Sequence, residues 1–359
     1  MHIHIVVAAR PNFMKAAPLW RALSKQSWAD ISLIHTGQHY DYAMSDVFFA
    51  ELGLPTPHIN LGIAGTTHGQ QTGRVLEAYE RVLLSERPDL VIVCGDVNAT
   101  PAAALAAVKL GIRTAHLEAG LRSFDRSMPE EINRIVTDSI CDILWTPSSD
   151  ADKNLLNEGV AKDKIHKIGN IMIDTLTLLR PCIEKTSLPA DLDIANKPYA
   201  LVTLHRPSNV DSQTTLKELC DALLKCATQK NLVFPLHPRT RNRLEQFGLF
   251  SKILSCPSIK VTAPLPYCTF MRLLFGADAV VTDSGGVQEE TSFLGIPCLT
   301  LRENTERPIT ITSGTNQLLN AALLPEVLAS TRRPPVAPSI PLWDGCAAQR
   351  ALKTIQSLL

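Results

Sequence analysis

The stretch LVIVCGDVNATPAAALAAVKLGIRTAH, residues Leu90–His116, contains a complete β-α-β unit. Leu90–Cys94 and Arg113–His116 are short runs with the composition of buried strands. Between them, Thr100 supplies a capping hydroxyl, a proline suits the first helical position, and the alanine-rich segment that follows stops at Gly111. This order predicts two parallel strands joined by a crossover helix.

The same alternation of strand and helix runs through the whole chain. At 359 residues, the chain exceeds the roughly 250 to 300 at which one core stops growing, so two domains are expected. Prolines and aspartates break the periodicity between Arg180 and Pro198, which predicts a linker. We therefore expect an α/β protein with Rossmann-like domains at residues 1–180 and 198–340 and a helix within 341–359. The expected strands are Ile3–Val7, Ile31–His35, Leu90–Cys94, Arg113–His116, Ile143–Trp145, Ala200–Leu204, Val233–Leu236, Ile259–Val261, Ala279–Thr282 and Cys298–Leu301.

Composition restricts the class of partner. Lys plus Arg and Asp plus Glu number 35 each, and no local run of basic residues is present, so a small molecule is favoured over nucleic acid. The first residues lack the pattern of a secretory signal, and no apolar run approaches the roughly 20 residues of a membrane span. The nine cysteines are scattered without metal-ligand spacing. These features predict a soluble cytoplasmic protein with reduced, buried thiols and no membrane association.

A glycine-bearing turn follows one strand of the second half. Asp283-Ser284-Gly285-Gly286 comes directly after Ala279–Thr282 and precedes a helical segment. The glycines allow close approach of a phosphate, and the helix N-terminus supplies free N–H groups. Glu289 and Glu290 follow in that helix, where a carboxylate can accept the hydroxyls of a ribose. The alternative is an ordinary strand-to-helix turn.

Charged side chains also cluster after the strands of the first half. Arg10 and Lys15 follow the first strand and suit one anion, although they also fit solvated surface charges. Asp96 and Glu118 end two neighbouring strands, and Glu130 with Glu131 begins a helix. Carboxylates that converge on one site suit general acid and base catalysis, whereas each alone also fits a helix cap or ion pair.

Two histidines close strands of the second half. His205 and His237 suit phosphate binding or proton transfer. They do not suggest a metal site, because no third ligand stands at regular spacing. Arg307 lies in a polar loop after the last expected strand and offers a further donor to an anion.

Taken together, these segments resemble the non-hydrolysing UDP-N-acetylglucosamine 2-epimerases over nearly the whole chain. The resemblance implies two Rossmann-like halves facing across a cleft, of the glycosyltransferase-B type, with UDP on the second half and a C-terminal helix that returns to the first. It implies reversible inversion at C2 to UDP-N-acetylmannosamine, a precursor of cell-surface polysaccharide, through elimination of UDP and 2-acetamidoglucal. It implies no metal and no redox cofactor. It also implies that the protein forms a homodimer. The motifs that carry it are Arg10-Pro11 with Lys15, Thr36-Gly37-Gln38-His39, Gly95-Asp96, His116–Arg122, Pro129–Arg134, His205-Arg206-Pro207, Asp283–Glu290 and Leu301–Pro308.

The resemblance also implies residue roles. Catalytic positions match Asp96, Glu118, Glu130 and His205. Substrate-binding positions match Arg10, Lys15, His237, Phe270 (stacked on uracil), Ser284, Gly285 and Gly286 (phosphate), Glu290 (ribose) and Arg307. An activating second UDP-N-acetylglucosamine, bound by many bacterial members, would use Gln38, His39, Arg74, Glu131, Arg206 and also His237.

Some positions depart from the family pattern. Asn12 stands where a family acid is usual, and Ser208 where many members have Glu. Asp41 replaces a common Gln, which weighs against allosteric activation. Three alternatives to this function remain: a hydrolysing 2-epimerase that releases UDP and N-acetylmannosamine, a glycosyltransferase of the same fold, and a nucleotide-sugar binding protein without activity.

Overall fold

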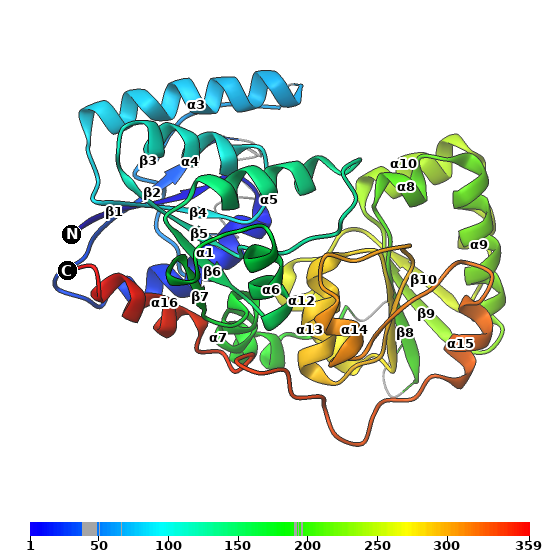
Figure 1. Ribbon diagram of the computed structural model, residues 1–359. Helices are drawn as coiled ribbons and strands as arrows, with labels where there is room; N and C mark the ends of the chain where they lie inside the picture. Colours follow the sequence, from blue (N-terminus) through cyan, green and yellow to red (C-terminus); the bar gives the residue numbers. More distant parts are fainter. Residues whose placement is uncertain (38–48, 50, 66, 190–191, 193, 195–196) are drawn as a thin grey trace. The chain divides into compact units, whose positions relative to one another are not determined.

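The computed structural model describes residues 1–37, 49, 51–65, 67–189, 192, 194 and 197–359. The chain divides into two compact units, which are Met1–Leu178 with Pro341–Leu359, and Leu179–Ile340. Among the described residues, no helix is long and apolar enough to cross a membrane. Each unit is an α/β assembly around its own sheet, and the two sheets are labelled in Figure 1.

The first unit contains a parallel sheet with strand order β3-β2-β1-β4-β5-β6-β7. Helices α3, α4 and α5 pack side by side over one face, and α1 packs with α16 on the other (Figure 1). The elements are β1 His2–Val7, α1 Arg10–Leu23, β2 Asp30–His35, β3 Ile59–Asn60, α3 His68–Ser85, β4 Leu90–Cys94, α4 Ala99–Lys109, β5 Arg113–Leu117, α5 Pro129–Ile140, β6 Ile143–Thr146, α6 Ser149–Asn157, the 3-10 turn Lys162–Lys164, β7 Ile165–Lys167 and α16 Ala347–Gln356. Helix α7, Ile171–Lys185, begins in this unit and ends in the second.

The β-α-β unit at β4, α4 and β5 forms the centre of this sheet. Strand β4 is buried along its whole length, as expected for a parallel strand covered on both faces. The alanines of α4 are also buried, so this helix packs closely between the sheet and α3. The prediction that Thr100 caps α4 is wrong. Thr100 lies inside the helix, and its hydroxyl donates instead to the Cys94 carbonyl at 2.9 Å, which joins α4 to the end of β4.

The second unit has a parallel sheet with strand order β10-β9-β8-β11-β12-β13. Its apolar core fills the space between the strands and helices α9, α11 and α15. The elements are β8 Tyr199–Thr203, α8 Pro207–Val210, α9 Gln213–Ala227, β9 Asn231–Pro235, α10 Pro238–Gln246, α11 Phe250–Leu254, β10 Ile259–Thr262, α12 Tyr267–Gly276, β11 Ala279–Thr282, α13 Gly285–Leu294, β12 Cys298–Thr300, α14 Ile309–Thr312, β13 Asn316–Leu318 and α15 Leu324–Ser330.

The expected linker begins later than its composition predicts. Helix α7 continues through Pro181 to Lys185, because Leu179 and Ile183 lie one turn apart and are both buried. The expectation that all cysteines are buried is also wrong, since Cys182 and Cys346 are exposed and Cys256 is half-buried, although none of the nine forms a disulfide.

The predicted α/β architecture with two parallel sheets is confirmed. Because the strands of each sheet run in one direction, their carboxyl ends lie along one edge of that sheet. Loops at such edges are where ligands bind in open α/β sheets. Each unit therefore brings its own set of candidate side chains to one edge.

Candidate active site

In the first unit, Lys15 reaches into the protein rather than into solvent. Its Nζ lies 2.8 Å from Glu118 Oε1, and both side chains are buried. Gly95, at the end of β4, permits this position of the ammonium group, because a Cβ on Gly95 would lie 2.7 Å from Lys15 Nζ. Gly95 also has φ of +65°, a conformation that favours glycine. Arg10, which begins α1, is exposed.

Asn12 joins the ends of β1 and β4. Its Oδ1 accepts hydrogen bonds from the N–H groups of Ala8 and Ala9, at 3.2 and 3.0 Å, and its Nδ2 donates to the Cys94 carbonyl at 2.9 Å. An ionised acid could accept these N–H groups but could not make the third bond. The departure from the family acid at this position thus has a structural role of its own.

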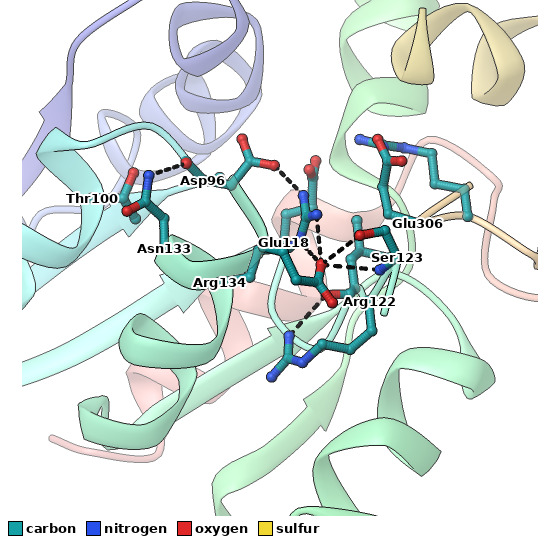
Figure 2. Close-up of polar contacts among 12 residues, drawn as sticks. Asp96, Thr100, Glu118, Arg122, Ser123, Asn133, Arg134 and Glu306 are labelled. Carbon is teal, nitrogen blue, oxygen red and sulfur yellow. Dashed lines mark hydrogen bonds and ion pairs between the residues drawn. The ribbon is translucent and has the colours of Figure 1, made fainter. Parts of the chain in front are cut away.

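Asp96 is held by α5. Arg134 Nη1 donates to Asp96 Oδ2 at 2.5 Å, and Arg134 Nη2 donates to Glu131 Oε2 at 2.7 Å, so one guanidinium bridges two carboxylates (Figure 2). Asn133 Nδ2 donates to the Asp96 carbonyl at 2.8 Å. Sequence reasoning assigned no role to Arg134. The sequence feature that could have identified it is its position one helical turn after Glu130 and Glu131, which places it on the same side of α5.

Glu131, matched above to the activator site, is fully engaged inside the first unit. Its carboxylate accepts the N–H and hydroxyl of Ser123, both at 3.0 Å, and the Phe124 N–H at 2.9 Å. Burial opposes ionisation, but these N–H groups and Arg134 outweigh it and lower the pKa of Glu131 below its ordinary value. Glu131 therefore anchors the loop that precedes α5.

Glu130 differs from the other carboxylates of this edge. It is half-buried in the first turn of α5, and its side chain makes no hydrogen bond or ion pair with any residue that the structure describes. Glu130 thus remains available to a ligand, whereas Asp96 and Glu118 each contact a cation.

In the second unit, His205 is oriented by Asp283, a residue to which sequence reasoning gave no role. His205 Nδ1 lies 3.1 Å from Asp283 Oδ1, and the buried carboxylate also accepts the N–H groups of His205 and Arg206 at 2.9 Å each. Although burial opposes ionisation, these contacts lower the pKa of Asp283 below its ordinary value. With Nδ1 turned to Asp283, His205 can present Nε2 to a ligand.

His237 lies beside His205, with 5.4 Å between the ring centroids. Burial, together with the neighbouring His205, lowers the pKa of His237 below its usual value. Its Nδ1 accepts the N–H of Arg239 at 3.2 Å, which leaves Nε2 as the other polar atom of the ring. The structure thus brings the two histidines predicted from separate strands together.

The turn Ser284-Gly285-Gly286 opens α13, so its N–H groups lie at a helix N-terminus. Ser284 and Gly286 are half-buried, whereas Gly285 is buried against the loop that carries Arg307. A Cβ on Gly285 would lie 2.6 Å from Arg307 Nη1 and 2.7 Å from Glu306 Oε1. Glycine at this position thus leaves room for the charged ends of Arg307 and Glu306 close to the turn.

The loop around Arg307 holds a cluster of charges. Arg307 Nε lies 2.8 Å from Glu289 Oε1, and Arg307 Nη1 lies 2.5 Å from Glu306 Oε1. Glu306 also lies 2.9 Å from Arg302 Nη2 and 3.7 Å from Arg206 Nη2. Several guanidinium groups around one buried carboxylate make a setting that attracts an anion. Glu289 thus pairs with Arg307 in this loop.

Glu290 pairs with a tyrosine that sequence reasoning missed. The Tyr267 hydroxyl donates to Glu290 Oε1 at 2.7 Å, and both side chains are buried. Tyr267 begins α12, and Phe270 follows three residues later, half-buried on the same helix. Residues three positions apart lie on the same side of a helix, so Phe270 and Tyr267, the hydrogen-bond partner of Glu290, lie on the same side of α12.

The remaining candidates fall elsewhere. Arg74 is exposed on α3, where its side chain makes no hydrogen bond or ion pair with another described residue. Gln38, His39 and Asp41 lie outside the described residues. Within the described part of the chain, the side chains placed to share a metal ion are His2, His4 and Glu86, at the opposite, amino-terminal edge of the first sheet.

Comparison with known proteins identifies the family. A family model described as UDP-N-acetylglucosamine 2-epimerase matches residues 21–356. The chain belongs to the UDP-N-acetylglucosamine 2-epimerase family. Among the relatives of this epimerase-family chain is the UDP-N-acetylglucosamine 2-epimerase of Methanocaldococcus jannaschii, 45% identical over 89% of this chain and 88% of the relative.

A second relative has a different name. The UDP-2,3-diacetamido-2,3-dideoxy-D-glucuronate 2-epimerase of Pseudomonas aeruginosa is 42% identical to this epimerase-family chain, over 90% of this chain and 89% of the relative. Among solved structures, the M. jannaschii UDP-GlcNAc 2-epimerase in complex with UDP-GlcNAc and UDP matches with a TM-score of 0.91 and 42% identity, over 99% of this chain and all of the other.

Proposed function

We propose that the chain catalyses the reversible epimerisation of UDP-N-acetylglucosamine to UDP-N-acetylmannosamine without hydrolysis. The observation that carries this proposal is the set of carboxylates at the carboxyl edge of the first sheet. Asp96 contacts Arg134, Glu118 contacts Lys15, and Glu130 contacts no described cation. Carboxylates in different settings suit removal of a proton on one face and its return on the other.

In the proposed reaction, a carboxylate removes the proton at C2 and the C1–O bond to UDP breaks. The products of this half are UDP and 2-acetamidoglucal, and no other atom is gained or lost. A proton then returns to C2 on the opposite face, while UDP adds back to C1. Because the proton leaves one face and returns on the other, one group acts as the base and another as the acid. These roles are exchanged in the reverse direction, so one set of groups serves both epimers.

The proposal assigns UDP to the second unit. The N–H groups of Ser284-Gly285-Gly286, together with Arg307, suit the diphosphate, and His205 with Nδ1 held by Asp283 can donate to its oxygens. Glu290, oriented by Tyr267, suits the ribose hydroxyls, and Phe270 suits uracil. Stabilising the leaving diphosphate lowers the barrier for C1–O cleavage, which the weak acidity at C2 makes necessary.

Product analysis in heavy water tests the proposal. Incubation of the protein with UDP-N-acetylglucosamine is expected to yield UDP-N-acetylmannosamine with deuterium at C2, and deuterium at C2 of recovered substrate. Steady accumulation of free UDP and N-acetylmannosamine would instead identify a hydrolysing enzyme. Because one relative is named for a diacetamido glucuronate, UDP-2,3-diacetamido-2,3-dideoxy-D-glucuronate should be tested in the same assay. If the protein turns over this compound faster than UDP-N-acetylglucosamine, the proposed substrate is wrong and the proposed type of reaction stands.

A further inference from the structure

His116, at the end of β5, is completely buried and hydrogen-bonded at both ring nitrogens. Its Nδ1 lies 2.6 Å from Asp138 Oδ1, and its Nε2 lies 2.8 Å from the Gly95 carbonyl oxygen. A carbonyl oxygen can only accept, so Nε2 carries a proton. The other nitrogen faces a carboxylate and also donates. The side chain therefore bridges Asp138 to the loop that carries Asp96.

The Asp138 carboxylate fixes the turn after β5 at several points. Its second oxygen accepts the Gly120 N–H at 3.0 Å and lies 2.7 Å from Arg122 Nη1. Burial opposes ionisation of Asp138, but His116 and Arg122 outweigh it and lower the pKa of Asp138 below its ordinary value. Arg122 is held in turn by both oxygens of Glu158, at 2.8 and 2.7 Å.

Glu118 lies within the turn that these contacts fix. Its backbone has φ of +78°, a left-handed conformation that is unfavourable for a non-glycine residue. The N–H groups of Glu118 and Ala119 both donate to the Trp145 carbonyl, at 3.2 and 2.9 Å. Such a conformation persists only where the surroundings hold it. His116 and Gly120, the residues two before and two after Glu118, are both held by Asp138.

We propose that Asp138 and His116 are positioning residues for epimerisation: they hold the left-handed turn that presents Glu118, and through the Gly95 carbonyl they hold the Asp96 loop against it. This inference rests on the proposed function for the roles of Glu118 and Asp96. Neither positioning residue needs to touch substrate. Their effect is to fix the separation of two carboxylates that must act on one carbon.

An ordinary buried ion pair would predict a different outcome. Removal of one partner of such a pair lowers stability wherever the pair lies. Only a positioning role predicts that turnover falls while nucleotide affinity is kept, since the residues proposed to bind UDP belong to the other unit. The decisive readout is therefore the loss of kcat set against the change in UDP affinity, compared with a variant at a second buried aspartate.

Asp174 provides a control at a second buried aspartate of the first unit. Its carboxylate accepts two backbone N–H groups, those of Ala347 and Ala348, at 3.0 and 2.8 Å. Burial raises the pKa of Asp174 to about 6, whereas Asp138 is paired with His116 and Arg122. Asp174 begins no turn that carries a candidate residue, so Asp174→Asn tests whether the loss of a buried carboxylate by itself lowers turnover.

We expect Asp138→Asn to lower kcat and C2 exchange by at least about tenfold, with the Kd for UDP within about threefold of wild type. Asp174→Asn should keep kcat within about threefold, and its Tm should fall less than that of Asp138→Asn, because burial raises the pKa of Asp174 to about 6 and so disfavours its charged form. Equal losses of kcat in the two variants, or full kcat in Asp138→Asn, would overturn the inference. If Asp138→Asn does not fold, His116→Gln, which keeps the Asp138–Arg122 pair, is expected to show the same split.

Selective 15N labelling of histidine separates this inference from the proposed function. In wild type, His116 Nε2 should carry a proton that exchanges slowly with solvent, as expected for a buried donor to the Gly95 carbonyl, with its signal assigned by its loss in His116→Gln. An unprotonated or rapidly exchanging Nε2 would overturn the inference even in an active enzyme. A protected Nε2 proton in a protein that does not epimerise UDP sugars would leave the contact intact and refute the proposed function instead.

Discussion

Lys15 Nζ and Glu118 Oε1 lie 2.8 Å apart, and the two side chains are only 6% and 4% exposed. Neither charge can be solvated by bulk water, so each depends on the other and on neighbouring polar groups. This pairing gives the ammonium group a defined role, because it orients a buried carboxylate beside the end of β4. Lys15 is thus the partner of one of the proposed catalytic carboxylates, and its effects on activity and on stability can be measured separately.

The first prediction concerns this pair. Lys15→Met should lower the free energy of unfolding by about 3 kcal/mol, because it leaves Glu118 buried beside an apolar group. Lys15→Met with Glu118→Gln should recover most of that stability and remain inactive. Urea denaturation and epimerase assays measure both quantities. Lys25→Met, at an exposed lysine of the same unit, is the control. Equal instability of the single and double variants would contradict the pairing.

A second prediction concerns Arg134, which bridges Asp96 and Glu131. Lysine keeps the charge but cannot donate along two directions from one rigid plane. Arg134→Lys is therefore expected to lower kcat about tenfold or more through misplacement of Asp96. Arg81→Lys, in an exposed pair with Glu77, is the control and should leave kcat unchanged. Wild-type turnover in Arg134→Lys would show that Asp96 needs no bridge.

Tyr267 and Tyr199 allow a matched test of the proposed ribose site. Both hydroxyls are buried and donate one hydrogen bond in the second unit, Tyr267 to Glu290 at 2.7 Å and Tyr199 to the Leu273 carbonyl at 2.5 Å. Tyr267→Phe should weaken UDP binding by about three- to tenfold, since loss of one such bond costs about 1 kcal/mol. Tyr199→Phe should lower stability and spare affinity. Calorimetric titration with UDP distinguishes them, and equal affinities would place the ribose elsewhere.

The lowered pKa of Asp283 predicts how the free energy of unfolding changes at acidic pH. Because the folded protein lowers the pKa of Asp283, its ionised form stabilises the fold above the unfolded value of about 3.9, and this contribution disappears as pH falls below it. Between pH 4 and pH 2, the wild-type free energy of unfolding should fall more steeply than that of Asp283→Asn, by up to about 1.4 kcal/mol per pH unit. Parallel curves would contradict the assignment. Asp278→Asn, at a more exposed carboxylate, is the control.

Much of the fold could be predicted because most strands are short, uninterrupted apolar runs that alternate with helical segments. Leu90–Cys94 and Ala279–Thr282 have the bounds that the sequence indicates. The short strands β3, β7 and β13 were missed, since two or three residues carry no periodicity. Helix α7 was ended too early at Pro181, because tertiary burial of Ile183 outweighs the local preference of proline.

The site could be predicted only in part. Residues directly after a strand, such as Asp96 and Glu118, can be identified as candidates from their position in the sequence. The residues that contact the candidate side chains and turns cannot be identified in this way. Arg134, Asp138 and Tyr267 make their contacts through helix packing, which the sequence alone does not define. The burial of Lys15 was missed for the same reason, as a lysine near the start of a helix more often faces solvent.

Glu130 offers the most direct test of the central claim, that carboxylates of the first unit move the C2 proton while the second unit holds UDP. Its side chain contacts no described partner, so Glu130→Gln removes one charge without breaking a recorded contact. The measurement is deuterium exchange at C2 of intact UDP-N-acetylglucosamine, beside UDP affinity, with Glu326→Gln at an exposed residue of the second unit as control. The account predicts at least about hundredfold slower exchange in Glu130→Gln, unchanged UDP affinity, and a control equal to wild type. Wild-type exchange in Glu130→Gln, with the same UDP affinity, would contradict it.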